Sequence, residues 1–360
     1  MEKSEISGIK IACVYIGTVV GAGFATGQEI VQFFVSFGLP GLWGILLSTL
    51  LFVLYGVLIM HLGAKFSAKS HLEILDGIKA KAPKQMMDVL IMISLFGALT
   101  AMMAGAGAVF AQQWGLPAIL GSFFMGTVAS LTVLRGFRGV ISAVSAVVPF
   151  LLLSVFIIAG YTLLYGYGLF AFPPQAARER ALMGNWFFAA LLYAAYNILM
   201  SASVLAPLGG AAKNRRQIFY GAAWGGIGLG AASLFIYLAI LSDFSGAGGR
   251  EVPLLYLAGR ISPLVTLAFT FVLLAEIYTT AVGALYGFST RLAELGRGKT
   301  AGLICITAGL AFLASLFGFS NLVRYLYPIQ GYGGLVFLIL ICYAGLKSWH
   351  LAKKKKRKKL

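Results

Sequence analysis

The chain has 360 residues, of which 60% are hydrophobic and only 11% are charged, and its mean hydropathy is +0.91. A typical soluble domain carries about 25% charged residues, so this composition excludes a soluble globular protein and indicates a membrane protein. The formal net charge of +17 is explained by membrane topology, because basic residues accumulate on the cytoplasmic side of a bilayer.

Repeated apolar runs of about 20 residues predict an all-α integral membrane protein with ten transmembrane helices. The expected spans are residues 8–36, 40–64, 85–111, 116–134, 139–165, 184–208, 217–242, 261–290, 300–318 and 322–346. Because the connections are short, residues 1–346 are expected to form one transmembrane domain, followed by a basic tail at 347–360.

The distribution of basic residues predicts the orientation. With the N-terminus in the cytoplasm, all but five of the 28 Lys and Arg residues fall on the inner side; the five are Arg178, Arg180, Arg250, Arg260 and Arg324. This bias is the one that orients membrane helices. We therefore expect a multi-pass protein of the bacterial inner (plasma) membrane with both termini in the cytoplasm. The tail is expected to lie against anionic lipid headgroups, with no nucleic-acid partner.

The first span carries an unusual density of glycine, in the segment Gly17-Thr-Val-Val-Gly21-Ala-Gly23-Phe-Ala-Thr-Gly27. Each glycine weakens a helix by about 1 kcal/mol relative to alanine. Lipid cannot satisfy the freed backbone groups, so such a break is tolerated only inside protein or beside a cavity. Broken helices of this kind hold substrate and coupling ion in secondary transporters.

Ten spans divide into two sets of five with opposite membrane orientation, which is the condition for an inverted repeat. The first repeat is expected at about 8–165 and the second at about 184–346. The first and sixth spans then correspond, and both are predicted to be broken helices. In the sixth span the expected break is Ala194-Ala195-Tyr196-Asn197, where polar side chains enter an apolar helix. Outside the spans, we expect a cytoplasmic amphipathic helix at 70–83, a long outer loop at 166–183 and a short outer helix at 251–260.

Two carboxyl groups, those of Glu29 and Glu276, fall well inside expected spans. An unpaired ionised acid at this depth costs several kcal/mol, so each is a candidate for ion coupling or gating. Glu276 and Thr280 are four residues apart and share a helix face, with Thr279 close by. The alternatives are a structural hydrogen bond between helices for Glu276 and a water-accessible position near the outer mouth for Glu29.

Together, the ten-span plan, the glycine-rich first span and the neighbouring hydroxyls of the eighth span resemble the amino acid–polyamine–organocation superfamily, which has the LeuT-type fold. The segment from Gly17 to Gln32 and the overall length look more closely like the YkvI-like family of bacterial membrane proteins. The resemblance to the superfamily covers nearly the whole chain. It implies a 5+5 inverted repeat with substrate and ion bound near the bilayer centre.

The resemblance also implies roles for individual residues. The backbone carbonyls of Gly17 and Val20 and the hydroxyls of Thr279 and Thr280 would be ligands of Na⁺, a hard cation that prefers oxygen. Backbone N–H groups in the break, which suit a carboxylate, would belong to Gly21, Ala22 and Gly23. Apart from the resemblance, the aromatic residues Phe24, Tyr193 and Tyr196 are candidates for the walls of the pocket. Asn197 is a candidate for an amide that contacts the substrate, with a bridge between helices as the alternative. The break itself contains no acidic side chain, so it offers no obvious charge to a cationic amine.

These observations predict a secondary active transporter for a small organic solute, most simply an amino acid or similar zwitterion, without an organic cofactor. Na⁺ is the favoured coupling ion and H⁺ is the alternative. A second alternative is a membrane receptor on the same fold, similar to germinant receptors. Enzymatic activity is not expected: Gly296-Arg-Gly-Lys-Thr300 superficially suggests a phosphate loop, but the required earlier glycine is replaced by Ala293.

Overall fold

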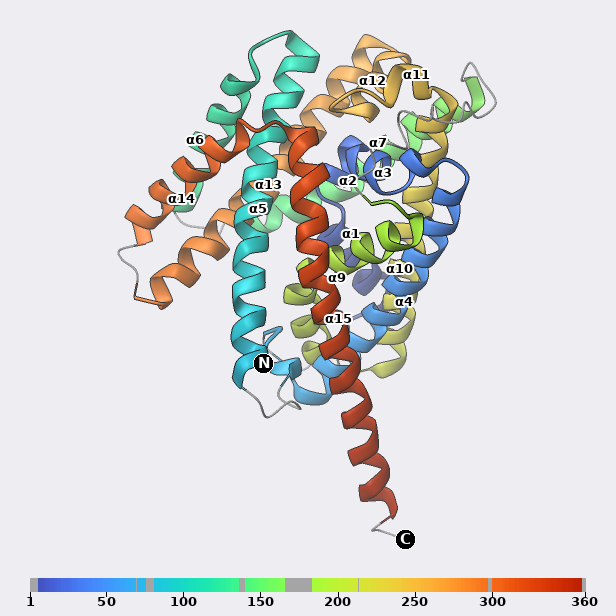
Figure 1. Cartoon of the computed structure of the whole chain (residues 1–360), viewed down its shortest axis with the longest axis vertical. Coiled ribbons are helices and arrows are strands. Elements are labelled where there is room, and N and C mark those ends of the chain that lie inside the picture. Colours follow the sequence, from blue (N-terminus) through green and yellow to red (C-terminus); the bar gives the residue numbers. More distant parts are fainter. Residues whose placement is uncertain are drawn as a thin grey trace.

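The fold is described from a computed structural model (Figure 1), which defines residues 6–68, 70–75, 81–135, 140–165, 183–212, 214–296 and 300–357. All regular elements in these ranges are helices. The expected outer loop at 166–183 lies outside the described residues apart from position 183. Of the expected amphipathic helix at 70–83, residues 76–80 are not described, 70–75 hold turns and one short 3-10 helix, η2 (Glu73–Leu75), and 81–83 already belong to the next long helix. The described part of this segment is therefore not the single helix that was expected.

Ten helical segments of the described chain coincide with the ten expected spans. The first is a set of short helices, α1 (Gly8–Val19), α2 (Ala22–Thr26), α3 (Gln28–Phe33) and η1 (Val35–Phe37). The others are α4 (Pro40–Phe66), α5 (Lys81–Trp114), α6 (Ala118–Arg135), α7 (Val140–Tyr165), α9 (Trp186–Ala211), α10 (Arg215–Ser242), α13 (Pro263–Glu294), α14 (Thr300–Ser315) and α15 (Phe319–Arg357). Eight of the helices in the described ranges are long and apolar enough to cross a membrane, while α1 and α14 are shorter apolar helices.

The helices form two groups that pack side by side. A bundle group contains α1, α4, α9 and α10, and a scaffold group contains α5, α6, α13 and α14. Helix α15 contacts both groups, chiefly through α9 and α5. At one end of the molecule, α11 (Phe244–Ala247) and α12 (Pro253–Gly259) cover the helices, and at the other end α15 extends beyond them (Figure 1). The short helix expected at 251–260 is thus confirmed.

Small residues explain the close packing of the bundle group. The ring of Tyr15 on α1 fits against Gly56 of α4 and Gly225 of α10, where an added Cβ would come within 2.6 Å of ring carbons. The Tyr15 hydroxyl donates a 2.8 Å hydrogen bond to the carbonyl oxygen of Phe52. Fully buried and internally satisfied, this tyrosine fixes α1 between α4 and α10.

The first span is broken, as its glycines predict. Helix α1 ends at Val19, and the chain continues in extended conformation through Gly21 (φ −115°, ψ −174°) before α2 begins. A second break lies at Gly27, whose φ of +82° is a conformation that favours glycine. The hydroxyl of Thr26 bridges this turn, because it donates to the carbonyl oxygen of Gly23 and accepts from the N–H of Gln28.

The predicted break in the sixth span is wrong. Helix α9 runs without interruption from Trp186 to Ala211 and passes through Ala194–Asn197 as regular helix. This stretch contains alanines, which are the best helix formers, and it has no glycine. The amide of Asn197 donates to the carbonyl oxygen of Tyr193 at 3.0 Å, one turn earlier, so its polar side chain is satisfied within the helix.

Two polar contacts tie the scaffold group to its surroundings. At one end, Arg291 of α13 forms a bidentate ion pair with Asp88 of α5, with an Nη2–Oδ2 distance of 2.8 Å. At the other end, the side-chain amide of Gln112 on α5 both donates to and accepts from the backbone of Val252 just before α12. The α12 segment then lies over the first span, where Leu254 approaches Gly27.

Candidate functional site: a cavity at the break of the first span

A cavity of about 100 Å³ lies between the bundle group and the scaffold group, at the break between α1 and α2. The first span contributes Gly17, Thr18, Val19, Val20, Gly21, Gly23 and Glu29 to its lining. The other helices contribute Ala98 and Met102 from α5, Tyr196, Asn197 and Met200 from α9, Thr280 from α13, and Tyr327 and Gln330 from α15. The cavity therefore joins segments from both halves of the chain.

Glu29 reaches this cavity because the chain turns at Gly27. In a straight helix, residues 23 and 29 would be about 9 Å apart along the axis and on largely opposite faces. Instead, the carboxyl group of Glu29 lies directly against the Cα of Gly23, in the space that a Cβ would occupy. The hydroxyl of Tyr196 donates a hydrogen bond to the Glu29 carboxylate oxygen Oε2. Glu29 is only 4% exposed, so this contact and the cavity form its polar surroundings.

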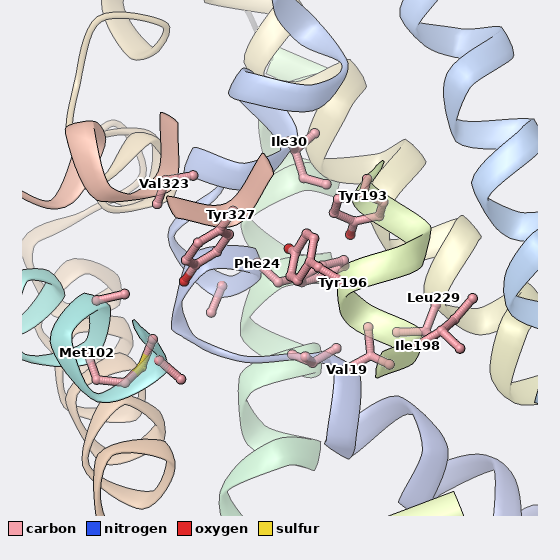
Figure 2. Close-up of a cluster of buried hydrophobic side chains, with 14 of the residues drawn as sticks. Val19, Phe24, Ile30, Met102, Tyr193, Tyr196, Ile198, Leu229, Val323 and Tyr327 are labelled. Carbon is pink, nitrogen blue, oxygen red and sulfur yellow. The ribbon is translucent and has the colours of Figure 1, made fainter. Parts of the chain in front are cut away.

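Aromatic side chains pack around the α2–α3 segment beside the cavity (Figure 2). The Tyr196 ring lies 5.2 Å from the ring of Tyr327 and 5.8 Å from that of Phe33, measured between centroids. Tyr193 packs behind them, with its ring 5.4 Å from Phe33. All four residues are buried. These tilted ring contacts make a packed aromatic wall on the α3 side of the cavity.

Two of the lining amides have already donated to backbone oxygens. The Nδ2 atom of Asn197 donates to Tyr193, and the Nε2 atom of Gln330 donates to the carbonyl oxygen of Ser94 at 3.4 Å. The Thr18 hydroxyl likewise donates to the carbonyl oxygen of Tyr15 at 2.8 Å. The amides keep a second N–H donor each, and all three groups keep acceptor capacity on their oxygens. In the described part of the chain, no Lys, Arg or His side chain lines the cavity.

Helix α13 places its polar residues differently. Thr280 lines the cavity and interacts with the carboxyl group of Glu276, one turn earlier. Thr279 instead donates to the backbone oxygen of Glu276 at 3.0 Å and is buried outside the lining. The Oε2 atom of Glu276 is buried and has no hydrogen-bond partner in the described structure. The paired hydroxyls therefore have separate environments.

Most of the expected site residues meet at this cavity. Gly17, Val20, Gly21, Gly23, Glu29, Tyr196, Asn197 and Thr280 line it. Phe24, Tyr193, Glu276 and Thr279 are buried behind the lining, and the backbone of Ala22 lies between two lining residues. Their functional roles stay predictions.

The residues that α5 and α15 contribute to the cavity lining were not predicted from the sequence. Gln330 carried a detectable signal, since it is an amide in the middle of an apolar span. Tyr327 is one of many aromatic residues in the chain, and Ala98 and Met102 are ordinary residues for such a helix. Without the packing of α5 and α15, nothing distinguishes these three from other buried side chains.

A first span broken near its centre, two groups of helices packed side by side and a cavity between them define a membrane protein of the LeuT-fold class. Solved structures agree over nearly the whole chain. The inward-facing conformation of Mhp1 aligns with 94% of this chain and 76% of its own, with a TM-score of 0.65 at 14% identity. MhsT in complex with L-phenylalanine aligns with 96% of this chain and 98% of its own, with a TM-score of 0.60 at 15% identity. A mutant of the manganese transporter of Eremococcus coleocola has a TM-score of 0.58 at 13% identity, covering 94% of this chain and 81% of its own.

Within that class, the chain is homologous to two proteins of Bacillus subtilis (strain 168). It is 29% identical to the membrane protein YkvI over 350 residues, which is 95% of this chain and 97% of YkvI. It is also 29% identical to YyaD over 349 residues, covering 95% of this chain and 98% of YyaD. No family model matches the sequence. The matches to YkvI and YyaD agree with the resemblance to YkvI-like membrane proteins, and the solved structures show that the fold is of the LeuT type.

Proposed function

We propose that this protein is a secondary active transporter that moves a small organic solute across the bacterial plasma membrane by alternating access. The observation that carries the proposal is the cavity at the α1–α2 break, lined by residues of both the bundle group and the scaffold group. Relative movement of two helix groups around such a site exposes it to each side of the membrane in turn. The cytoplasmic orientation of both termini and the contact of the basic tail with anionic lipid are parts of this proposal.

Na⁺ is the proposed coupling ion. Since α1 ends at Val19, no continuing helix supplies N–H donors to the carbonyl groups that follow Ile16, and Gly17 and Val20 both line the cavity. Thr280 supplies a hydroxyl from the facing helix α13. Together these oxygens are suitable ligands for a hard cation, with Thr279 as a further candidate. The buried carboxyl groups of Glu29 and Glu276 favour H⁺ as the second candidate.

Uptake into proteoliposomes tests the proposal. Purified protein is reconstituted, and accumulation of radiolabelled alanine and glycine is followed under an inward Na⁺ gradient, an inward H⁺ gradient or neither. Accumulation driven by Na⁺ supports the symporter, and the double variant Thr279→Ala with Thr280→Ala is expected to remove the Na⁺ dependence. Accumulation driven only by H⁺ would transfer the coupling role to Glu29 or Glu276. Binding without flux under any gradient would instead support a receptor.

A further inference from the structure

The composition of the cavity lining restricts the chemistry of its ligand. Among the lining residues, Glu29 has the one carboxylate, and none is a basic side chain in the described structure. The amides of Asn197 and Gln330 have each used one of their two N–H donors on a backbone oxygen and keep their carbonyl oxygens as acceptors. Because the lining holds a carboxylate and no basic side chain in the described structure, it fits a ligand group that donates hydrogen bonds and carries positive charge.

The size of the cavity restricts the ligand further. An apolar cavity of about 150 Å³ accommodates benzene, with six carbon atoms. By that scale, the cavity of about 100 Å³ takes roughly four non-hydrogen atoms. Ethanolamine has this size and glycine and alanine are slightly larger, whereas leucine and phenylalanine are far larger.

From these two restrictions we propose that the cavity binds a small primary amine or amino acid, with the Glu29 carboxylate as counter-ion of its ammonium group. An ammonium group has three donors, and Glu29, Asn197 and Gln330 present oxygens that can accept them. The rings of Tyr196 and Tyr327, whose centroids are 5.2 Å apart, add faces that attract a cation.

Tyr196 has a positioning role in this arrangement. Its hydroxyl donates to Oε2 of Glu29, while Oε1 lies beside Gly23, in the space that a Cβ would occupy. The hydrogen bond and the close packing against Gly23 place the carboxylate at the cavity, where an ammonium group would sit. The absence of acidic residues from the break itself is thus compensated by Glu29, six residues after Gly23.

The inference rests on the proposed site of transport but is tested by binding alone. Three pairs of ligands differ only by replacement of ammonium with hydroxyl: alanine and lactate, glycine and glycolate, ethanolamine and ethylene glycol. Thermal stability of the purified protein is measured with each ligand in NaCl and in KCl. We expect each amine to raise the melting temperature and its hydroxyl counterpart to leave it unchanged, because ligand binding stabilises the folded state.

Equal stabilisation within the pairs, preference for the hydroxyl members or no response to all six ligands would each overturn the inference. So would stabilisation by Na⁺ alone that depends on Glu29, since the carboxylate would then be an ion ligand. Uptake of lactate or glycolate, with no amine bound, would contradict this inference while supporting transport. Binding of amines without uptake would support this inference and contradict transport.

The variant Glu29→Gln tests whether Glu29 is the counter-ion of the ammonium group. It keeps the shape of the side chain and removes the charge, so the affinity for the amine that stabilises best is expected to fall at least tenfold. Glu294→Gln is the matched control, because Glu294 pairs with Arg291 at the end of α13 and does not line the cavity. Equal affinity in both variants would overturn the assignment. If Glu29→Gln does not fold, the ligand pairs on the unmodified protein still decide the inference.

Discussion

The first span and α9 are the two segments that the inverted-repeat argument pairs as broken helices, yet only the first span is broken. Glycines at positions 21 and 27 coincide with the two interruptions of the first span. Helix α9 has alanines at 194 and 195 and stays helical. The comparison teaches that polar residues alone do not break a membrane helix when they can bond to their own backbone, as Asn197 does.

The difference also assigns the two segments different tasks. The broken span supplies backbone groups and lets the chain turn so that Glu29 comes back to Gly23. The intact helix presents Tyr196 and Asn197 to the cavity. A segment that offers backbone groups and a continuous helix that offers side chains therefore meet at the same site.

Gly23→Val is expected to have the largest effect, because it prevents the Glu29 carboxyl group from lying against residue 23 in the broken first span. Its Cβ would occupy the position of the Glu29 carboxyl group, only 2.8 Å from Cδ. Glu29 must then move and lose its bond from Tyr196. Overpacking together with that loss is expected to cost about 3 kcal/mol of stability. Thermal unfolding and amine binding measure the two consequences, and an unchanged affinity would refute the role of this contact.

Replacing Ala194 and Ala195 together with glycine tests why α9 is continuous. If alanine propensity maintains the helix, the double variant loses about 2 kcal/mol of stability. Ligand affinity falls as well, because Tyr196 and Asn197 directly follow the altered residues. The matched control is Ala222→Gly with Ala223→Gly in α10, which has the same intrinsic cost away from the cavity lining. Equal affinities in the two double variants would show that α9 need not be rigid.

The break in the first span could be predicted from the sequence, but the continuity of α9 and the path of Glu29 to the cavity could not. Glycine density identified the first break, with Gly21 and Gly23 at the cavity, since weak helix formers act locally. The inverted-repeat argument predicted the wrong conformation for α9, where the local propensity of alanine prevails. The approach of Glu29 to Gly23 depends on the turn at Gly27, and the places of Tyr327 and Gln330 depend on the packing of α15. Neither follows from periodicity.

Tyr196→Phe is expected to have a smaller effect, because it removes one hydrogen bond and keeps the ring. The Glu29 carboxylate loses its donor, at a cost of about 1.5 kcal/mol in stability. Amine affinity is expected to fall several-fold as the carboxylate loses its fixed position. Tyr193→Phe is the control, since Tyr193 is equally buried on the same helix but does not donate to Glu29. Titration of both variants with alanine measures the difference, and matching affinities would contradict a positioning role for Tyr196.

Gly21→Ala is expected to have the smallest effect, although Gly21 also lines the cavity. Its backbone is extended, a conformation open to any residue, and an added Cβ would have no atom within 4 Å. The free energy of unfolding should therefore stay within about 0.5 kcal/mol of that of the unmodified protein, as for substitutions outside packed contacts. Binding should separate ligands by size: alanine should lose more affinity than glycine, because the new methyl group projects into a small cavity. A loss of stability as large as that of Gly23→Val would mean that the break needs glycine for its conformation at both positions. A small loss of stability would show that only position 23 requires glycine, because there the carboxyl group of Glu29 occupies the space of a side chain.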